Sequence, residues 1–168
     1  MNLKLINEIK SETEKQCAYH LIQLFWKEHN NYIQNMEDAI EHYNQWTSVG
    51  HLFYLIEYEN KNIGFVHLGS RGGQIDWLED IFIIPEMQGK GIGRKVIFMI
   101  EEIVKKYSES LYLEVAARNL AALKLYYELG FNCLNTLTIR KDFQDQKFDV
   151  INNENINGYT FEVKKYKK

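Results

Sequence analysis

The feature of this sequence that most constrains its fold is a glycine-rich run placed between an apolar strand and an amphipathic helix. The run reads Gln88-Gly89-Lys90-Gly91-Ile92-Gly93-Arg94. Residues 79–84 directly before it read as a buried strand, which ends at Pro85, the only proline of the chain. After the run, apolar side chains recur at helical spacing on one face, namely Val96, Ile97, Ile100, Ile103, Val104 and Tyr107. The pattern predicts a strand, a tight turn and a helix in direct succession.

The predicted turn has the character of a phosphate-binding site. A glycine-rich turn that leads into a helix directs several backbone N–H groups, and the positive end of the helix dipole, toward one point. Lys90, Arg94 and Lys95 lie within reach to assist. The run is neither a Gly-x4-Gly-Lys-Ser/Thr loop nor a dinucleotide fingerprint, because Arg94 stands three residues after Gly91 where a third glycine would be required. A plain strand-to-helix corner is the alternative, and the run alone does not distinguish the two.

The rest of the chain predicts a mixed order of helices and strands. Ser11 with Glu14 forms a capping-box pattern that begins a helix, and Asn35 and Asn119 are expected to cap two more, the last of which stops at Gly130. The turn at 59–62 is expected to join two strands as a hairpin. Besides the helix after the glycine-rich run, we expect helices over 11–29, 36–46 and 119–130, strands over 3–6, 52–58, 63–68, 74–84, 111–115, 131–140 and 159–166, and a polar loop over 142–158.

Composition and charge fit a single enzyme-sized domain. The 168 residues are enough for one core and few for two, and 45% hydrophobic with 26% charged residues is ordinary for a soluble protein. A net charge of −3 argues against nucleic-acid binding, which favours a basic surface. Cys17 and Cys133 have no metal-ligand spacing, and we expect no metal. With no signal-peptide pattern and no apolar stretch of ~20 residues, we expect a cytoplasmic protein without membrane partners.

A second segment carries a family resemblance. It reads Asn119-Leu-Ala-Ala122-Leu-Lys-Leu125-Tyr126-Tyr-Glu-Leu-Gly130-Phe131. Together with the Gln-x-x-Gly-x-Gly run, its pattern of Asn, Ala, Leu-Tyr and Gly-Phe resembles the GCN5-related N-acetyltransferase (GNAT) superfamily, from about residue 52 to residue 131. The resemblance implies an α/β fold with a mixed six- to seven-stranded sheet and about four helices, in one domain over 1–168. It also implies acetyl-CoA as the donor and a primary amine as the acceptor, and it leaves open a homodimer.

The resemblance also locates the rest of the cofactor site. Pantetheine carries amides, so it can bind like an added strand where a strand offers unpaired backbone groups. In the family, two parallel strands separate beside the glycine-rich turn and provide that edge. The matching backbone positions here are Ile81, Phe82 and Ile83, with Asn119 after the second strand. The other reading of residues 81–84 is a buried strand, and both readings can hold together.

Two carboxylates compete for the role of general base. An amine with a pKa near ~10 is protonated at neutral pH, and only the free amine attacks the thioester. Leu78-Glu79-Asp80-Ile81-Phe82 resembles the strand entry of spermidine/spermine N-acetyltransferases, which implies Glu79 as the base. Leu113-Glu114-Val115 resembles the ribosomal-protein alanine N-acetyltransferases, which implies Glu114. We favour Glu79, because Asp76 and Asp80 add negative charge for a cationic acceptor; a salt bridge to a neighbouring Lys or Arg is the alternative for either residue. Asp80 alternates to the opposite face of the strand from Glu79 unless a bulge intervenes.

The departing thiolate needs a partner, and the resemblance implies Tyr126. The alternative is a core tyrosine, since Ala122, Leu125 and Leu129 share its helical face. Full transfer of a proton from a tyrosine with pKa ~10 to a thiolate with pKa ~8.5 is uphill by roughly 2 kcal/mol, so a hydrogen bond to the sulfur is favoured, unless the helix and nearby cations lower the tyrosine pKa. Tyr127 points about 100° away on the helix.

The acceptor is expected to be a small cationic amine of the polyamine or aminosugar type. The acidic residues beside Trp77 suit such an amine by charge and by cation–π contact. A peptide N-terminus or a lysine is the rival acceptor, and a non-catalytic acetyl-CoA-binding sensor is the alternative to an enzyme.

Overall fold

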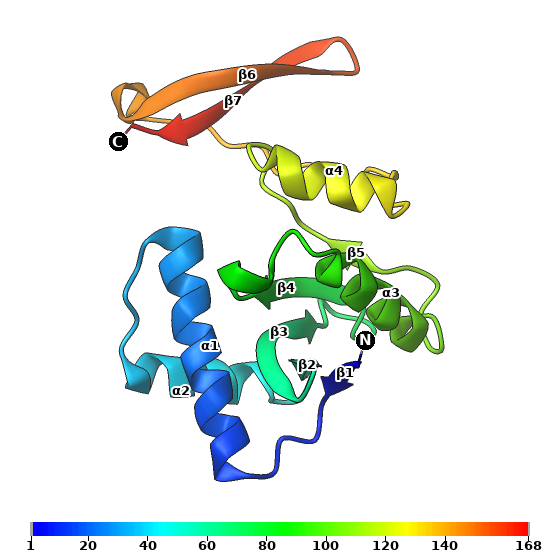
Figure 1. Ribbon diagram of the computed structural model, residues 1–168. Coiled ribbons are helices and arrows are strands. Elements are labelled where there is room, and N and C mark those ends of the chain that lie inside the picture. Colours follow the sequence, from blue (N-terminus) through cyan, green and yellow to red (C-terminus); the bar gives the residue numbers. More distant parts are fainter. Residues whose placement is uncertain (1, 168) are drawn as a thin grey trace. The chain divides into compact units, whose positions relative to one another are not determined.

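The computed structural model describes residues 2–167, which fall into two compact units. The first unit runs up to Glu114 and the second begins at Val115. Figure 1 labels their helices and strands. The mixture of helices and strands confirms the predicted α/β class, while a single domain over residues 1–168 stays a prediction.

The first unit is built on a five-stranded sheet in the order β1-β2-β3-β4-β5. Neighbouring strands are antiparallel from β1 to β4, and β5 is parallel to β4. Glu59 and Asn60 both have positive φ, 48° and 62°, as the two-residue turn of the β2–β3 hairpin requires. The strands are β1 (Leu3–Ile6), β2 (His51–Tyr58), β3 (Lys61–Gly69), β4 (Trp77–Ile83) and β5 (Tyr112–Leu113), and the helices are α1 (Glu12–Asn30), α2 (Met36–Trp46) and α3 (Ile92–Val104).

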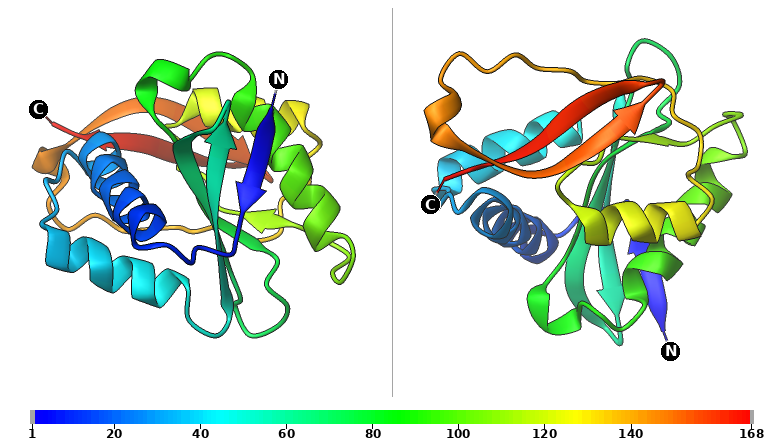
Figure 2. Two further views of the ribbon diagram at one scale, coloured as in Figure 1. Left: turned by 60° about the horizontal axis from the view of Figure 1, so that its bottom comes forward. Right: turned by 90° about the horizontal axis from the view of Figure 1, so that it is seen from above.

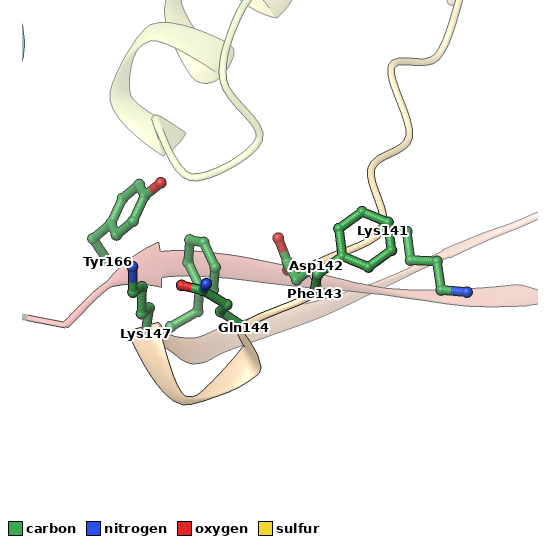
Figure 3. A pocket seen from close by; sticks show the side chains of 7 residues that line it. Lys141, Asp142, Phe143, Gln144, Lys147 and Tyr166 are labelled. Carbon is green, nitrogen blue, oxygen red and sulfur yellow. The ribbon is translucent and has the colours of Figure 1, made fainter.

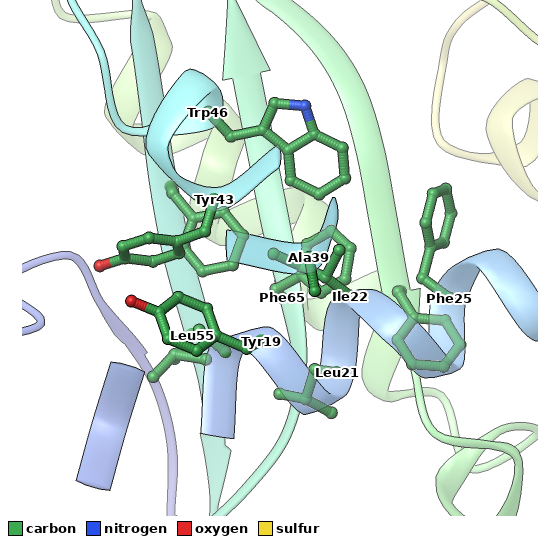
Figure 4. Packing of buried hydrophobic residues seen from close by; sticks show 12 residues of the cluster. Tyr19, Leu21, Ile22, Phe25, Ala39, Tyr43, Trp46, Leu55 and Phe65 are labelled. Atoms are coloured by element: carbon green, nitrogen blue, oxygen red, sulfur yellow. The ribbon is translucent and has the colours of Figure 1, made fainter. Parts of the chain in front are cut away.

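Helices cover both faces of this sheet. Figure 2 shows α1 and α2 on one face and α3 on the other. The first face is filled by an aromatic core centred on Phe65, whose ring lies 5.2–5.9 Å from the rings of Phe25, Phe53, Trp46 and Phe82 (Figure 4). The α3 face is aliphatic, with Val96, Ile97, Ile100 and Val104 fully buried as the helical spacing predicted. Apolar burial therefore holds β3 and β4 from both sides.

Three helix starts confirm the capping predictions. The Ser11 hydroxyl accepts from the Glu14 N–H at 3.2 Å, while the Glu14 carboxylate accepts from the Ser11 N–H at 2.9 Å. Asn35 Oδ1 accepts from the N–H of Asp38 at 2.8 Å, and Asn119 Oδ1 accepts from that of Ala122 at 3.2 Å. Each cap satisfies backbone donors that a helix leaves without acceptors.

The second unit contains α4 (Leu120–Glu128) and a two-stranded sheet of β6 (Phe148–Ile156) and β7 (Tyr159–Tyr166). A shallow pocket at the base of the hairpin is lined by Lys141, Asp142, Phe143, Gln144, Lys147, Phe148 and Tyr166 (Figure 3).

The second unit corrects two predictions. Residues 131–140 form no strand, and the stretch 142–158 expected as a loop contains β6. The Asn-rich composition of β6 favours a loop, but Asn157-Gly158 forms a two-residue turn with positive φ at both positions, 53° and 85°. This turn pairs β6 with β7, and the pairing outweighs the low strand propensity of asparagine. In the first unit, β4 and β5 are also shorter than the expected 74–84 and 111–115.

Candidate functional site

The glycine-rich run forms the predicted turn at the start of α3. Pro85–Met87 is a short 3-10 turn after β4, and Gly91 is the residue that precedes the first turn of α3. Gly89 and Gly91 have φ of 72° and 73°, a left-handed conformation that costs other L-residues about 1–2 kcal/mol. The side chain of Gln88 donates to the carbonyl of Ile83 at 2.7 Å, which ties the turn to the end of β4.

The N-terminus of α3 is suited to an anion. Among residues 2–167, no side chain caps this helix, in contrast to the starts of α1, α2 and α4. The backbone N–H groups of the first turn of a helix have no acceptor within the helix, and they carry the positive end of its dipole. An uncapped helix start that follows two left-handed glycines is therefore compatible with the diphosphate of a cofactor.

One edge of β4 is open in the first unit. β5 pairs with β4 only at Trp77↔Tyr112 and Leu78↔Leu113. No strand of the first unit pairs with β4 on that side from residue 79 to residue 83. Alternate backbone N–H and C=O groups of a strand point to its two sides, so this segment, which includes Ile81, Phe82 and Ile83, offers hydrogen-bonding groups along the open edge. The edge ends where the glycine-rich turn begins.

A bulge in β4 changes the direction of its acidic side chains. β3 pairs His67 with Asp80 and Leu68 with Leu78, so Glu79 is an extra residue on β4. Asp80 lies on the face of His67, where its carboxylate accepts a hydrogen bond. Glu79 lies on the same face, because a Cβ built on Gly69, two residues after His67, would lie 2.9 Å from its Cγ. The expected alternation is therefore broken by the bulge, and both carboxylates face the side of α1 and α2.

Arg71 joins the two candidate bases. Its guanidinium donates to both oxygens of Glu79, at 3.0 and 2.7 Å, and to Glu114 Oε1 at 2.7 Å. Arg71 also lies over the ring of Trp77, 3.8 Å from the ring centre, and these hydrogen bonds raise its pKa above the usual value. Asp76, the third expected acidic residue, accepts a hydrogen bond from the Ser108 hydroxyl at 2.7 Å. Two carboxylates and an aromatic face thus surround one cation.

Sequence reasoning missed three residues of this region. Arg71 belongs to a Ser-Arg-Gly-Gly turn that carried only a turn signal. His51 and His67 are sixteen positions apart, but their rings are hydrogen-bonded across β2 and β3. The other ring nitrogen of His67 is bonded to Asp80. Burial, and then the charge of His67, hold the pKa of His51 below its usual value, while the charge of Glu79 acts in the opposite direction. The sequence indicated the His51–His67 pair only by placing one histidine in each of the two strands that the hairpin joins.

Tyr126 and Asn119 belong to the second unit. Asn119 caps α4 with its side chain. Tyr126 is half-buried and packs edge-on against Phe131, with ring centroids 5.8 Å apart. The neighbouring Tyr127 is 70% exposed, in agreement with its direction away from Tyr126 on the helix.

The described part of the chain contains neither a membrane-spanning helix nor a cluster of metal-binding side chains. Among residues 2–167, no helix combines the length and the apolar character that crossing a membrane requires. In the same part of the chain, no three His, Cys, Asp or Glu side chains gather closely enough to hold a metal ion.

Known sequences relate this chain to one enzyme family. The model of the acetyltransferase (GNAT) family matches residues 18–131. The spermine/spermidine N(1)-acetyltransferase of Bacillus subtilis (strain 168) is 31% identical over 126 residues, which cover 68% of this chain and 75% of that protein. The ribosomal protein bS18 alanine N-acetyltransferase of Escherichia coli (strain K12) is 40% identical over 67 residues, 39% of this chain and 43% of that protein.

Solved structures show the same fold. An aminoglycoside N-acetyltransferase in complex with CoA has a TM-score of 0.65 at 14% identity, over 84% of this chain and 95% of that one. An aminoglycoside 6′-N-acetyltransferase from Acinetobacter haemolyticus has a TM-score of 0.59 at 16% identity, over 84% and 98%. The fold is thus shared with acetyltransferases, and the sequence match covers both motifs. The chain therefore belongs to the acetyltransferase (GNAT) family and is an acetyltransferase.

Proposed function

We propose that this enzyme transfers an acetyl group from acetyl-CoA to the primary amine of a small cationic molecule, of the polyamine or aminosugar type. The amine attacks directly, Glu79 is the general base, and Tyr126 stabilises the departing thiolate. The observation that carries the choice of acceptor is the cluster around Arg71, in which two carboxylates and an indole ring hold a cation.

The residues that would hold acetyl-CoA are those of the turn and the open edge. The backbone of Gln88, Gly89, Lys90, Gly91, Ile92, Gly93 and Arg94 would bind the diphosphate. The backbone of Ile81, Phe82 and Ile83 would bind the pantetheine amides, and Asn119 would contribute from the second motif. Bound there, acetyl-CoA supplies an acyl group activated as a thioester. The uncapped helix start and the one-sided pairing of β4 support this assignment.

A cationic acceptor can replace Arg71 in this cluster. The Arg71 and Glu79 side chains are 36% and 24% exposed, so solvent can take up the guanidinium when it leaves Glu79. An ammonium group near Glu79 and the Trp77 ring would meet the same charge and the same aromatic face. We therefore infer that the acceptor amine binds where Arg71 now donates, and that Arg71 turns toward Glu114 or solvent.

The position of Glu79 supports the proposal that it removes the proton of that ammonium. Glu79 is the extra residue of the β4 bulge and follows Leu78, where the pairing with β5 ends, so its backbone begins the open edge. A carboxylate in this position contributes about 10²–10⁴-fold to the rate by accepting the amine proton. Glu114 binds the same guanidinium but is 58% exposed, which makes it the weaker candidate.

The Tyr126 hydroxyl would donate a hydrogen bond to the departing sulfur. Its packing against Phe131 fixes the ring at the end of α4, which is compatible with both a positioned donor and a core tyrosine. The family motif favours the donor. A hydrogen bond stabilises the thiolate without the unfavourable free energy that full proton transfer would require.

A protein N-terminus is the second candidate acceptor. The 40% identity to the bS18 alanine N-acetyltransferase favours it, and Glu114 would then be the base. A third candidate, an acetyl-CoA sensor without catalysis, would bind the cofactor and release no thiol.

The first test is thiol release from acetyl-CoA with a panel of polyamines, aminosugars, amino acids and N-terminal peptides. We expect kcat/KM for a polyamine or aminosugar to exceed that for every peptide by at least about tenfold, and KM to rise with salt because the acceptor is held by charge. A peptide as the best substrate would contradict the proposed acceptor. Cofactor binding without any thiol release would favour the sensor.

The second test concerns the glycine-rich turn. Gly91→Val places a β-branched residue at φ 73°, and the strain of about 1–2 kcal/mol or more must move the backbone of the turn. Isothermal titration calorimetry should show a Kd for acetyl-CoA weaker by at least about tenfold. Gly158→Val is the matched control, since Gly158 also has positive φ and open space at its Cβ but lies in the β6–β7 turn. Equal affinities in both variants would mean that the turn does not hold the cofactor.

The third test separates the two carboxylates. Glu79→Gln should lower kcat at neutral pH by at least about 10²-fold and shift activity to higher pH, where the amine loses its proton to solvent. Glu114→Gln removes the charge of the other carboxylate that binds Arg71 and should change kcat by less than about tenfold. Steady-state kinetics over pH measures both, and a larger loss in Glu114→Gln would transfer the role to Glu114.

The fourth test compares adjacent tyrosines of α4. Tyr126→Phe should lower kcat by at least about tenfold with little change in the Kd for acetyl-CoA, because only the hydrogen bond to the thiolate is lost. Tyr127→Phe removes a hydroxyl from an exposed ring of the same helix and should leave kcat unchanged. Thiol release and calorimetry provide the two readouts. An unchanged kcat in Tyr126→Phe would make Tyr126 a packing residue.

A further inference from the structure

Two histidines and an aspartate form a hydrogen-bonded chain on the face that carries Glu79. His67 is buried, with 4% of its surface exposed, and the Trp46 ring stacks on it at 4.8 Å between centroids. Nδ1 of His67 lies 2.9 Å from Oδ2 of Asp80. Its Nε2 lies 2.8 Å from Nδ1 of His51, which is half-buried. The chain thus runs from β4 through β3 to β2, with the buried His67 between two partly exposed ends, Asp80 on β4 and His51, the outer end, on β2.

The Asp80 carboxylate, at one end of the chain, determines where the protons lie. An ionised Asp80 only accepts, so Nδ1 of His67 carries a proton and donates it to Asp80. Nε2 of a neutral His67 is then an acceptor, and Nδ1 of His51 must be the donor to it. The centroids of the two imidazole rings are 5.0 Å apart, close to the longest separation that an N···N contact of 2.8 Å allows, so this hydrogen bond runs along both ring planes, where the N–H and the lone pair point. Nε2 of His51 is left with a lone pair at the outer end.

Gly69 brings Glu79 to that outer end. His51 and Gly69 are directly paired across β2 and β3. A Cβ at Gly69 would lie 2.9 Å from Cγ and 3.0 Å from Oε1 of Glu79. The Glu79 carboxylate therefore fills the space beside His51 that a side chain at residue 69 would take.

We propose that His51, His67 and Asp80 form a proton relay, in which His51 takes up the proton that Glu79 removes from the substrate amine. The proposal rests on the proposed function, with Glu79 as the general base. The proton passes from the Glu79 carboxyl group to Nε2 of His51, and His51 gives its Nδ1 proton to Nε2 of His67. Glu79 is then a carboxylate again, His51 is neutral, and His67 carries both ring protons and a positive charge. Only N–H and O–H bonds form and break, and the reverse sequence returns the proton to solvent after the product leaves.

The buried His67 can hold that charge. An imidazolium that is buried without a partner is costly, but His67 has the Asp80 carboxylate on one nitrogen and His51 on the other. Burial holds the pKa of His51 below its usual value, so a proton received there is readily passed on. The charged and titratable groups around the relay are Glu79 and Asp80 on β4, Arg71 bound to Glu79, and His42 of α2, whose ring contacts Trp46.

The protons of the resting relay can be observed directly. In protein labelled with ¹⁵N-histidine, long-range ¹H–¹⁵N spectra at neutral pH should show His51 and His67 both protonated on Nδ1 and not on Nε2. This readout needs no substrate and no variant, so it holds even if a substitution prevents folding. A proton on Nε2 of His51 would overturn the relay, because the outer nitrogen could not then accept one.

Kinetics test the role of the relay. Asp80→Asn keeps a hydrogen-bond acceptor for His67 but removes the negative charge, and His67→Gln interrupts the chain. Both should lower kcat at least about tenfold with KM for acetyl-CoA within about twofold. In both variants the kcat–pH profile should also change shape, because the relay no longer takes up the proton from Glu79. His42→Gln is the matched control, a partly buried histidine that is bonded to Gln34 and contacts the same Trp46, and it should change neither quantity.

The relay and the proposed function fail in different ways. If the unchanged chain acetylates amines while Asp80→Asn and His67→Gln keep its kcat and pH profile within about twofold, the relay is wrong and the acetyl transfer stands. If the unchanged chain acetylates no amine of the panel, the proposed function is wrong, and the relay falls with it.

Discussion

The pairing of β4 is the constraint on which the candidate site depends. On one side β4 is bonded to β3 along its length, and on the other β5 accompanies it for only two residue pairs. Backbone N–H and C=O groups that leave water need partners, so an open edge within a sheet is favoured where a ligand completes it. The glycine-rich turn begins at the end of the same strand and is tied to it by Gln88. One strand thus sets both the backbone edge and the position of the helix start beyond it.

The bulge at Glu79 gives this strand its second property. In a regular strand, adjacent carboxylates point to opposite faces, and one of them would face the aliphatic side under α3. The extra residue turns Glu79 and Asp80 to the same side, where each has a partner: Arg71 for one and His67 for the other. Gly69 completes the arrangement, because any side chain there would meet the Glu79 carboxylate. Two acidic groups of adjacent sequence can therefore have separate roles, one bonded to the partly exposed Arg71 and one bonded to the buried His67.

The sequence predicted the local features of the fold and not the pairings between distant residues. The bounds of α2, the three caps and the glycine turn follow from neighbours within a few positions, and all were confirmed. The loop predicted over 142–158 was wrong where β6 forms. The asparagines of β6 favour a loop, and its pairing with β7 depends on the Asn157-Gly158 turn beyond its end. The Arg71 cluster and the His51–His67 contact could not be predicted, since each joins residues from different elements, and a register shift of one residue would separate them.

The charges of the site explain why a cation occupies it. Glu79, Glu114 and Asp80 are three carboxylates in one region, and the Arg71 guanidinium binds two of them, Glu79 and Glu114. The excess of negative charge is local, since the chain as a whole carries only −3. If Arg71 left without replacement, Glu79 and Glu114 would lose the positive charge that now lies between them, and the Trp77 ring would lose the cation on its face. An incoming ammonium restores both interactions, whereas a neutral acceptor restores neither. In the proposed function, the preference for a charged amine and the removal of its proton would therefore depend on the same group of side chains.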